Sequence, residues 1–220
     1  MTGEAETLAT ARIAPEFEVR DVTWVKDAAA PTLSFALGVT ETSGREVFTI
    51  ALTAQINIDP ARRAYDAETR EALVELFGAP ERWAATTKSF VWAQVSTLVP
   101  SFMGDTTFTL PVPCTYDLEL AAAKYLYNVP DGEVPLSFHF TGSVLYRGDD
   151  GQMQVILIPW TCSAQWRMPV TSWREMMAHH YPGGGWIRVS DETLAELARH
   201  KARRGLHSYD ATVNELLDEG

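Results

Sequence analysis

The histidines near the C-terminal end are the first residues whose types could do chemistry. His179 and His180 are adjacent, and Glu175 precedes His179 by four residues. Adjacent side chains on a helix point about 100° apart, so the two imidazoles could not easily bind one metal ion. Glu175 and His179 could share a helix face, but a metal site usually takes three or four ligands. We therefore expect no metal and no other cofactor.

Two cysteines and one further histidine are the remaining candidates for catalysis. Cys114 and Cys162 form no Cys-x-x-Cys pair, and neither has a nearby basic neighbour in the sequence that would lower the pKa of its thiol. His139 lies in an alternating strand pattern, on the face opposite two phenylalanines, where we expect it to point to solvent. The leading prediction is that the protein is not an enzyme. An enzyme with a dispersed site that uses His139, His179 or Cys162 stays an alternative.

Basic side chains concentrate in one stretch near the C-terminus. At the end of a helix, these cations would interact favourably with the helix dipole. The same stretch could form a docking patch for an acidic partner, and both interpretations stay open. The residues of this basic stretch are Arg199, His200, Lys201, Arg203, Arg204 and His207.

Tryptophan, methionine and arginine are also dense in the last third of the chain. Large aromatic residues often anchor a core, which gives the first interpretation: a core between a sheet and its covering helices. The same residue types are enriched at protein–protein interfaces, which gives the second interpretation: a partner-binding surface. The predicted partner-binding residues are Trp166, Arg167, Trp173, Arg174, Trp186 and Arg188.

The elements that must position these side chains are mostly strands, because apolar and polar residues alternate over much of the chain. The first strand should slip near Arg20–Asp21, where the alternation breaks. Pro111 and Pro113 cannot donate to a sheet ladder, so they mark an edge or a crossing. The predicted strands cover residues 17–24, 33–39, 47–58, 88–99, 106–110, 135–146 and 153–160, with the last two as a hairpin.

Helical signals are fewer. Asp66 is a plausible N-cap for a helix that Gly78 would end. Residues 114–127 fit either a strand or a short helix, and we favour the strand. After Pro169 the apolar period becomes helical. The predicted C-terminal helices begin at Ser172, with Glu175 in a capping box, at Ser190, and at Asp210.

Strands followed by helices is the order of an α+β fold. Short turns between strands imply antiparallel pairing, so we predict a mainly antiparallel, β-sandwich-like sheet with one inserted helix and a helical C-terminal cap. Residues 1–14 are expected to be a flexible leader. Residues 15–220 are expected to be a single domain, with a β-rich part at 15–168 and the cap at 169–220.

Composition and charge exclude several classes of partner. The 220 residues are 46% hydrophobic and carry a formal net charge of −11. Such an acidic chain is a poor ligand for nucleic acid or for an anionic membrane surface. The N-terminus has acidic residues where a signal peptide would be basic, and no apolar run approaches the length of a membrane span. We therefore expect a cytoplasmic protein.

Several segments made of turns, prolines and tryptophans carry a family resemblance. From about residue 17 to 200, the chain resembles a family of uncharacterised bacterial proteins of about this length, often encoded beside uptake nickel–iron hydrogenases. The resemblance implies an accessory or assembly role for such an enzyme, and it brings no assigned catalytic residues. The segments that carry it are residues 76–83, 110–114, 134–142, 154–160 and 168–173.

The leading functional hypothesis is a non-enzymatic accessory protein that binds another protein, such as a hydrogenase subunit or maturation factor. A homo-oligomer is also considered. The alternative is a holdase-like chaperone with an exposed apolar groove on its sheet. Proline turns between strands and a helix that ends Leu76-Phe77-Gly78 resemble the export chaperone that holds unfolded precursors, although residues 130–220 have no counterpart there.

Overall fold

The computed structural model describes residues 13–115, 117, 120–183 and 187–218. They belong to two units, Met1–Gly184 and Gly185–Gly220, which we describe one at a time. The first unit holds the strands and the helices up to α5, and the second unit holds α6 and α7. None of the helices in the described ranges is long and apolar enough to cross a membrane.

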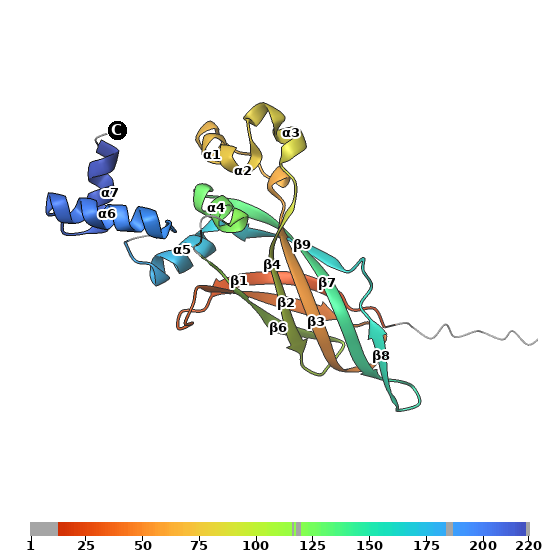
Figure 1. Cartoon of the computed structure of the whole chain (residues 1–220). Coiled ribbons are helices and arrows are strands. Elements are labelled where there is room, and N and C mark those ends of the chain that lie inside the picture. Colours follow the sequence, from red (N-terminus) through yellow and green to blue (C-terminus); the bar gives the residue numbers. More distant parts are fainter. Residues whose placement is uncertain (1–12, 116, 118–119, 184–186, 219–220) are drawn as a thin grey trace, which may run out of the picture. The chain divides into compact units, whose positions relative to one another are not determined.

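Three antiparallel strands form the smaller sheet of the first unit, in the order β1–β2–β6 (Figure 1). The register of β1 on β2 shifts between Val19 and Asp21, which confirms the slip predicted near Arg20. β6 lies at an edge of this sheet, as its two prolines predict, although it extends through both of them. The three strands are β1 (Glu16–Trp24), β2 (Thr32–Thr40) and β6 (Asp105–Pro113).

The larger sheet has the order β4–β3–β7–β8, with β5 beside β3 and β9 beside β7. β7 pairs with β3 along one edge, while its other edge pairs with β9 first and then with β8. The hairpin predicted after residue 135 is confirmed as β7 and β8, whereas β9 was not predicted. The strands are β3 (Glu46–Ile58), β4 (Phe90–Val99), β5 (Phe102–Met103), β7 (Glu133–Arg147), β8 (Met153–Leu157) and β9 (Ser163–Pro169).

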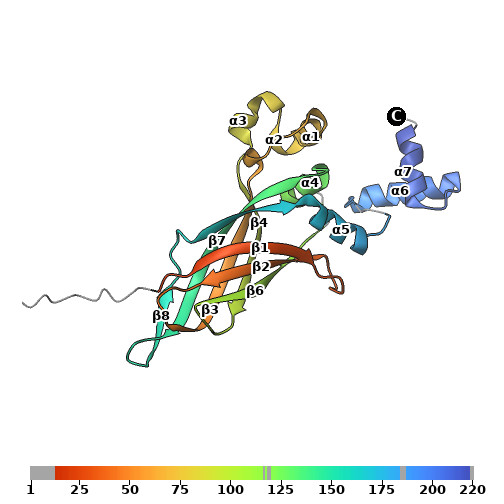
Figure 2. The same ribbon diagram turned by 180° about the vertical axis from the view of Figure 1, so that it is seen from behind.

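The two sheets pack face to face around the core (Figures 1 and 2). The rings of Phe17 and Phe140 stack across the interface with centroids 4.5 Å apart. Phe35 meets Phe138 edge to face at 5.3 Å, again between the sheets. Inward positions on each strand alternate with outward ones. The apolar residues that recur at every second position in the sequence are therefore the ones that form the core. The predicted α+β, mainly antiparallel, sandwich-like fold is confirmed.

Short helices fill the insertion between β3 and β4, beyond one end of the sheets, while β8 lies at the opposite end (Figures 1 and 2). Asp66 caps α1 by accepting a hydrogen bond from the Thr69 amide at 2.7 Å, and Gly78 ends α2 with a φ of +75°. Both predicted ends are confirmed, although the helix is interrupted at Leu73. The insertion contains η1 (Pro60–Arg62), α1 (Ala67–Ala72), α2 (Val74–Phe77), η2 (Pro80–Arg82) and α3 (Trp83–Thr86).

The strand favoured within residues 114–127 is wrong, because α4 spans Ala121–Asn128. Three successive alanines begin this helix, and alanine is the strongest helix former. Tyr125 and Leu126 are fully buried on its inner side. The Tyr125 hydroxyl lies 2.7 Å from the Tyr65 hydroxyl, which joins α4 to the insertion.

α5 (Val170–His180) begins earlier than predicted. The Val170 amide donates to the carbonyl of Gly132 at 2.9 Å, so a loop of the larger sheet satisfies the first helical N–H and the capping box predicted at Ser172 is wrong. α5 contacts β1, β2 and β9, and it therefore belongs to the first unit.

The second unit consists of α6 (Asp191–Arg204) and α7 (Tyr209–Asp218). The Ser190 hydroxyl accepts a hydrogen bond from the Thr193 amide at 3.2 Å, and Gly205 ends α6 in the left-handed conformation. The predicted start of this helix at Ser190 and its predicted end at Gly205 are therefore confirmed. The helices expected in one cap at 169–220 are thus divided between the two units, and the single domain at 15–220 stays a prediction.

Candidate functional site

The two predicted tryptophans on described residues turn inward. Trp173 on α5 is only 2% exposed and belongs to the hydrophobic core. Trp166 on β9 is half-buried, and its ring meets Phe35 of the smaller sheet edge to face at 6.0 Å. Their positions agree with the interpretation of this aromatic concentration as core, and Trp173 offers no surface to a partner in this structure.

The predicted arginines of the first unit bind backbone carbonyls. Arg174 donates to the carbonyl oxygens of Tyr127 and Val129, at 2.9 and 3.1 Å, at the end of α4. A helix end leaves its last carbonyls without partners inside the helix, so Arg174 completes the C-terminus of α4. Arg167 donates to the Arg62 carbonyl at 3.2 Å and stays exposed.

The remaining predicted residues do not complete a surface. Arg188 is exposed and lies in the second unit, whereas Trp186 lies outside the described residues. The structure brings Trp166 and Arg167 together on one strand, and Trp173 and Arg174 on one helix. Partner binding by this set stays a prediction.

Neither thiol is prepared for nucleophilic catalysis. Burial raises the pKa of the Cys114 thiol to about 12. Burial also raises the pKa of the Cys162 thiol, which donates to the Pro15 carbonyl at 3.3 Å. A thiol with a raised pKa carries little of the reactive thiolate at neutral pH. His139 is exposed on β7, as predicted, and within the described residues no hydrogen bond joins it to either thiol.

The adjacent histidines of α5 do not form a metal site. The His179 ring lies against Trp24 of β1, with centroids 4.7 Å apart, and the His180 ring is 5.4 Å from His179. Across the described ranges, no cluster of three or more His, Cys, Asp or Glu side chains is arranged to hold a metal ion. His179 therefore has a packing role between the helix and the smaller sheet.

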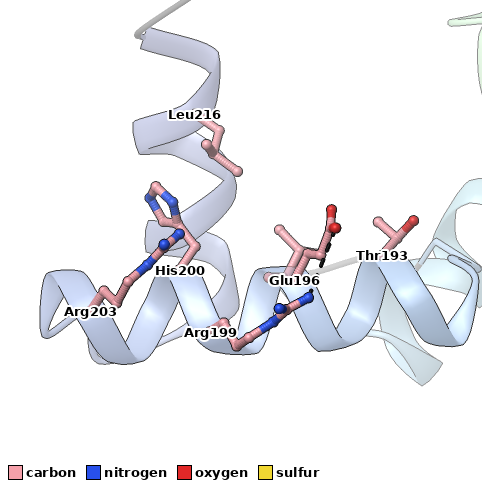
Figure 3. Close-up of a pocket in the computed structure, with 7 residues that line it drawn as sticks. Thr193, Glu196, Arg199, His200, Arg203 and Leu216 are labelled. Carbon is pink, nitrogen blue, oxygen red and sulfur yellow. Dashed lines mark ion pairs between the residues drawn. The ribbon is translucent and has the colours of Figure 1, made fainter.

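A pocket of about 480 Å³ lies in the second unit, in the angle between α6 and α7 (Figure 3). Most of its wall is one face of α6, because residues three and four apart on a helix project to the same side. His200 points from α6 toward α7, where Leu216 closes the other wall. The lining residues are Thr193, Glu196, Leu197, Arg199, His200, Arg203 and Leu216.

One acidic residue of α7 fixes this angle. Glu215 accepts a hydrogen bond from Arg204, and its carboxylate oxygen lies 3.7 Å from Nε2 of His200. That imidazole nitrogen is buried and has no hydrogen-bond partner in the described part of the chain. The Arg204–Glu215 pair therefore holds the two helices together and leaves other cations of the basic stretch for the pocket.

Two guanidinium groups remain at the pocket. Arg199 lies 3.9 Å from Glu196 across one turn of α6, a weak ion pair between exposed side chains. Arg203 is exposed and has no ion-pair partner among the described residues. Arginine suits carboxylates because its planar fork can donate two parallel hydrogen bonds. With Leu197 and Leu216 as apolar walls, the pocket suits an anionic group next to an apolar one.

These observations define the described part of the chain as an antiparallel α+β protein with a pocket between α6 and α7. The sequence matches the model of a family of unknown function, DUF6084, over residues 13–220, and the chain belongs to that family. The match includes both units.

No curated protein matches the sequence. Solved structures that are similar to the chain include the solution structure of a late embryogenesis abundant (LEA) protein, with a TM-score of 0.31, 17% identity and 75% of each chain covered. A β-glucosidase from Kluyveromyces marxianus has a TM-score of 0.26 and 8% identity, over 71% of this chain and 15% of that one. The ApaA protein from Bordetella pertussis has a TM-score of 0.23 and 10% identity, over 71% and 93%. These likenesses are too distant to carry an inference.

Proposed function

We propose that the protein is a non-enzymatic interaction protein whose second unit binds a short acidic segment of another protein. The observation that carries this proposal is the pocket between α6 and α7, where Arg199 and Arg203 stand beside two leucines. The ligand class follows from that lining: a peptide with Asp or Glu next to Leu or Phe.

The charge distribution supports an acidic partner for this pocket in particular. The chain as a whole carries a net charge of −11, so it repels acidic proteins at long range. A basic pocket on such a chain gains selectivity, because only a segment that reaches the guanidinium groups is attracted. Binding should therefore weaken as salt screens the contact.

A peptide titration tests the proposal. A fluorescently labelled peptide of Glu, Asp, Leu and Phe is titrated with the full chain at low salt, and its anisotropy is measured. Arg203→Glu should weaken binding by about fivefold, since one exposed ion pair contributes up to about 1 kcal/mol and the introduced carboxylate repels the acidic peptide. Glu196→Gln should strengthen binding, because it removes the ion pair of Arg199 with Glu196 and leaves only the hydrogen bond from Arg199 to the Ala195 carbonyl.

Arg82→Glu is the matched control, since Arg82 is an exposed arginine in the helical insertion of the first unit. It makes the same change in net charge and should leave the affinity close to that of the unchanged protein. An equal loss for Arg82→Glu and Arg203→Glu would show that total charge, and not the pocket, controls binding. If the peptide does not bind at a protein concentration of about 1 mM, at which even a very weak complex would form, the proposal is contradicted.

The family resemblance supports a narrower proposal: the partner is a nickel–iron hydrogenase subunit or one of its maturation factors. A low-salt affinity purification from the native host, read by mass spectrometry, compares the unchanged chain with Arg203→Glu. Hydrogenase proteins that are recovered with the first and lost with the second would agree with both proposals. Their absence would contradict the hydrogenase role and leave the acidic-segment proposal to the peptide titration.

A further inference from the structure

The outward face of the larger sheet carries a group of exposed apolar side chains near β8. Leu157 is 72% exposed, Val155 is 64% exposed and Met153 is 47% exposed, all on the same face of β8. Leu157 pairs with Ser143 of β7, and that row continues across β3 to Leu98 of β4, which is 70% exposed. We call the set Leu98, Leu145, Met153, Val155 and Leu157 the outer apolar face.

The backbone of β8 is also available on one side. β8 pairs with β7, and among the described residues no other strand pairs with it. Its sequence, Met-Gln-Val-Ile-Leu, has no charged residue and no proline, and its register on β7 has no bulge. Charges, prolines and bulges are among the devices that protect edge strands from pairing with other chains. An uncharged, apolar edge that lacks them is suited to pairing.

We propose that β8 pairs antiparallel with β8 of a second copy of the chain, which joins two larger sheets across a two-fold axis. With the axis at Val155, this residue faces itself, and Met153 of one copy faces Leu157 of the other. All three apolar side chains then meet apolar partners across the seam, where directly opposite residues lie about 5 Å apart. Such a self-complementary contact is the kind that a two-fold dimer requires.

The absence of charge on the set makes it compatible with a second copy as the occupant. Two chains of net charge −11 repel each other at long range, and a seam of uncharged side chains adds no like-charge contact to that repulsion. The outer apolar face has no ionisable side chain. Arg147, which pairs with Met153, lies 3.4 Å from Glu46 of its own chain. The dimer should therefore strengthen as salt is added, which is opposite to the salt effect expected for the acidic peptide.

Two paired strands of five residues each should bury less than the roughly 800 Å² per partner of a standard interface, so we expect a weak dimer with a dissociation constant on the order of 10 µM. Sedimentation velocity of the full chain over a range of concentrations measures it. Val155→Lys should weaken self-association at least about tenfold, because it places like charges opposite each other across the seam. Val91→Lys is the matched control: Val91 is 56% exposed on β4, outside the outer apolar face. Circular dichroism confirms that each variant is folded.

A cross-linking experiment tests the register. Val155→Cys places two thiols opposite each other at the axis, so a short thiol-to-thiol cross-linker should give a covalent dimer in high yield. Val91→Cys and the unchanged chain, which retains Cys114 and Cys162, should give little.

Three outcomes would overturn the proposal. The first is a chain that stays monomeric at about 200 µM, well above the expected dissociation constant. The second is self-association that Val155→Lys leaves unchanged. The third is a monomer that suppresses aggregation of an unfolded client and loses that activity in Val155→Lys, which would assign the outer apolar face to a holdase.

Discussion

Trp173 and Arg174 are neighbours in the sequence with different structural tasks. The Trp173 indole fills the core, while the Arg174 guanidinium binds the last carbonyls of α4. Residue types that are enriched at interfaces are also the ones that anchor cores and complete helix ends. Composition alone could therefore not separate the two interpretations, because the exposed fraction of each side chain depends on the packing around it.

Cys114 gives a prediction about stability at high pH. Its thiol has a pKa of about 12 in the folded protein, raised from 9.0 by burial. The folded state therefore keeps the proton after the unfolded state has lost it, so this contribution to stability is complete below about pH 9 and is lost between pH 9 and 12. We expect the free energy of unfolding to fall over this range, by up to about 1.4 kcal/mol per pH unit for one thiol.

Urea denaturation at pH 8 to 10 measures this slope. Tyr65 and Tyr125 also have raised pKa values because they are buried, so the informative quantity is the difference between the unchanged chain and Cys114→Ser. Serine keeps the size and the hydrogen-bond donor to the Val112 carbonyl but does not ionise in this range. Identical slopes for the two proteins would refute the assignment to Cys114.

At the scale of elements, β7 depends on one glycine where its partner changes from β9 to β8. Gly142 has a φ of +138°, and a Cβ atom there would lie 1.9 Å from the carbonyl oxygen of Ala51 on β3. That contact is with backbone and cannot be relieved by a side-chain rotation. Gly142→Ala should therefore lower the free energy of unfolding by at least about 3 kcal/mol or prevent folding.

Gly44→Ala is the control for the backbone conformation alone. Gly44 also has a positive φ, but a Cβ atom there would meet nothing within 4 Å. It should cost only about 1 kcal/mol, the price of a left-handed conformation for alanine. Thermal denaturation followed by circular dichroism compares the two variants, and equal losses would contradict a steric role for Gly142.

Strands were predictable from the sequence where one face of the sheet is buried, because apolar and polar residues then alternate along the strand. This held even for the slip near Arg20. β9 was missed because it is short, because its apolar positions are only Ala164, Trp166 and Met168, and because no glycine turn precedes it. α4 was misassigned because its segment satisfies both periods, and burial of Tyr125 in a helix decides between them.

The candidate site was predictable in part. The basic stretch that lines the pocket is visible in the sequence from Arg199 to Arg204. The pocket itself is not, because it requires α7 to place Leu216 and Glu215 against α6. The outer apolar face could not be predicted from the sequence either. It forms only because the strand registers bring together residues of β4, β7 and β8 that are distant in the chain.

At the scale of the whole molecule, the buried apolar cluster lies in the first unit. The cluster ends at Met177 in sequence, whereas α6 buries no residue and α7 buries Thr212. A chain that ends at Gly184 should therefore unfold cooperatively, as judged by near-UV circular dichroism during heating. It should keep self-association through β8 and lose binding of the acidic peptide.

Peptide binding that survives in this shortened chain would place the peptide site outside the second unit and contradict the proposed function alone. Loss of self-association in a folded, shortened chain would contradict the pairing of β8 alone. The two proposals can thus fail separately, since they rest on different units.

The pairing of β3 with β7 has a consequence for the newly made chain. Thr141 of β7 lies 88 residues after Thr53, its partner on β3. At a synthesis rate of roughly 5 to 20 residues per second, about 4 to 18 s pass between the synthesis of Thr53 on β3 and that of Thr141 on β7. Pairings between such distant residues also form slowly. During that interval, the apolar inner face of β3 is without the strand that completes its sheet, so the nascent chain must be kept from aggregating before the sandwich can close.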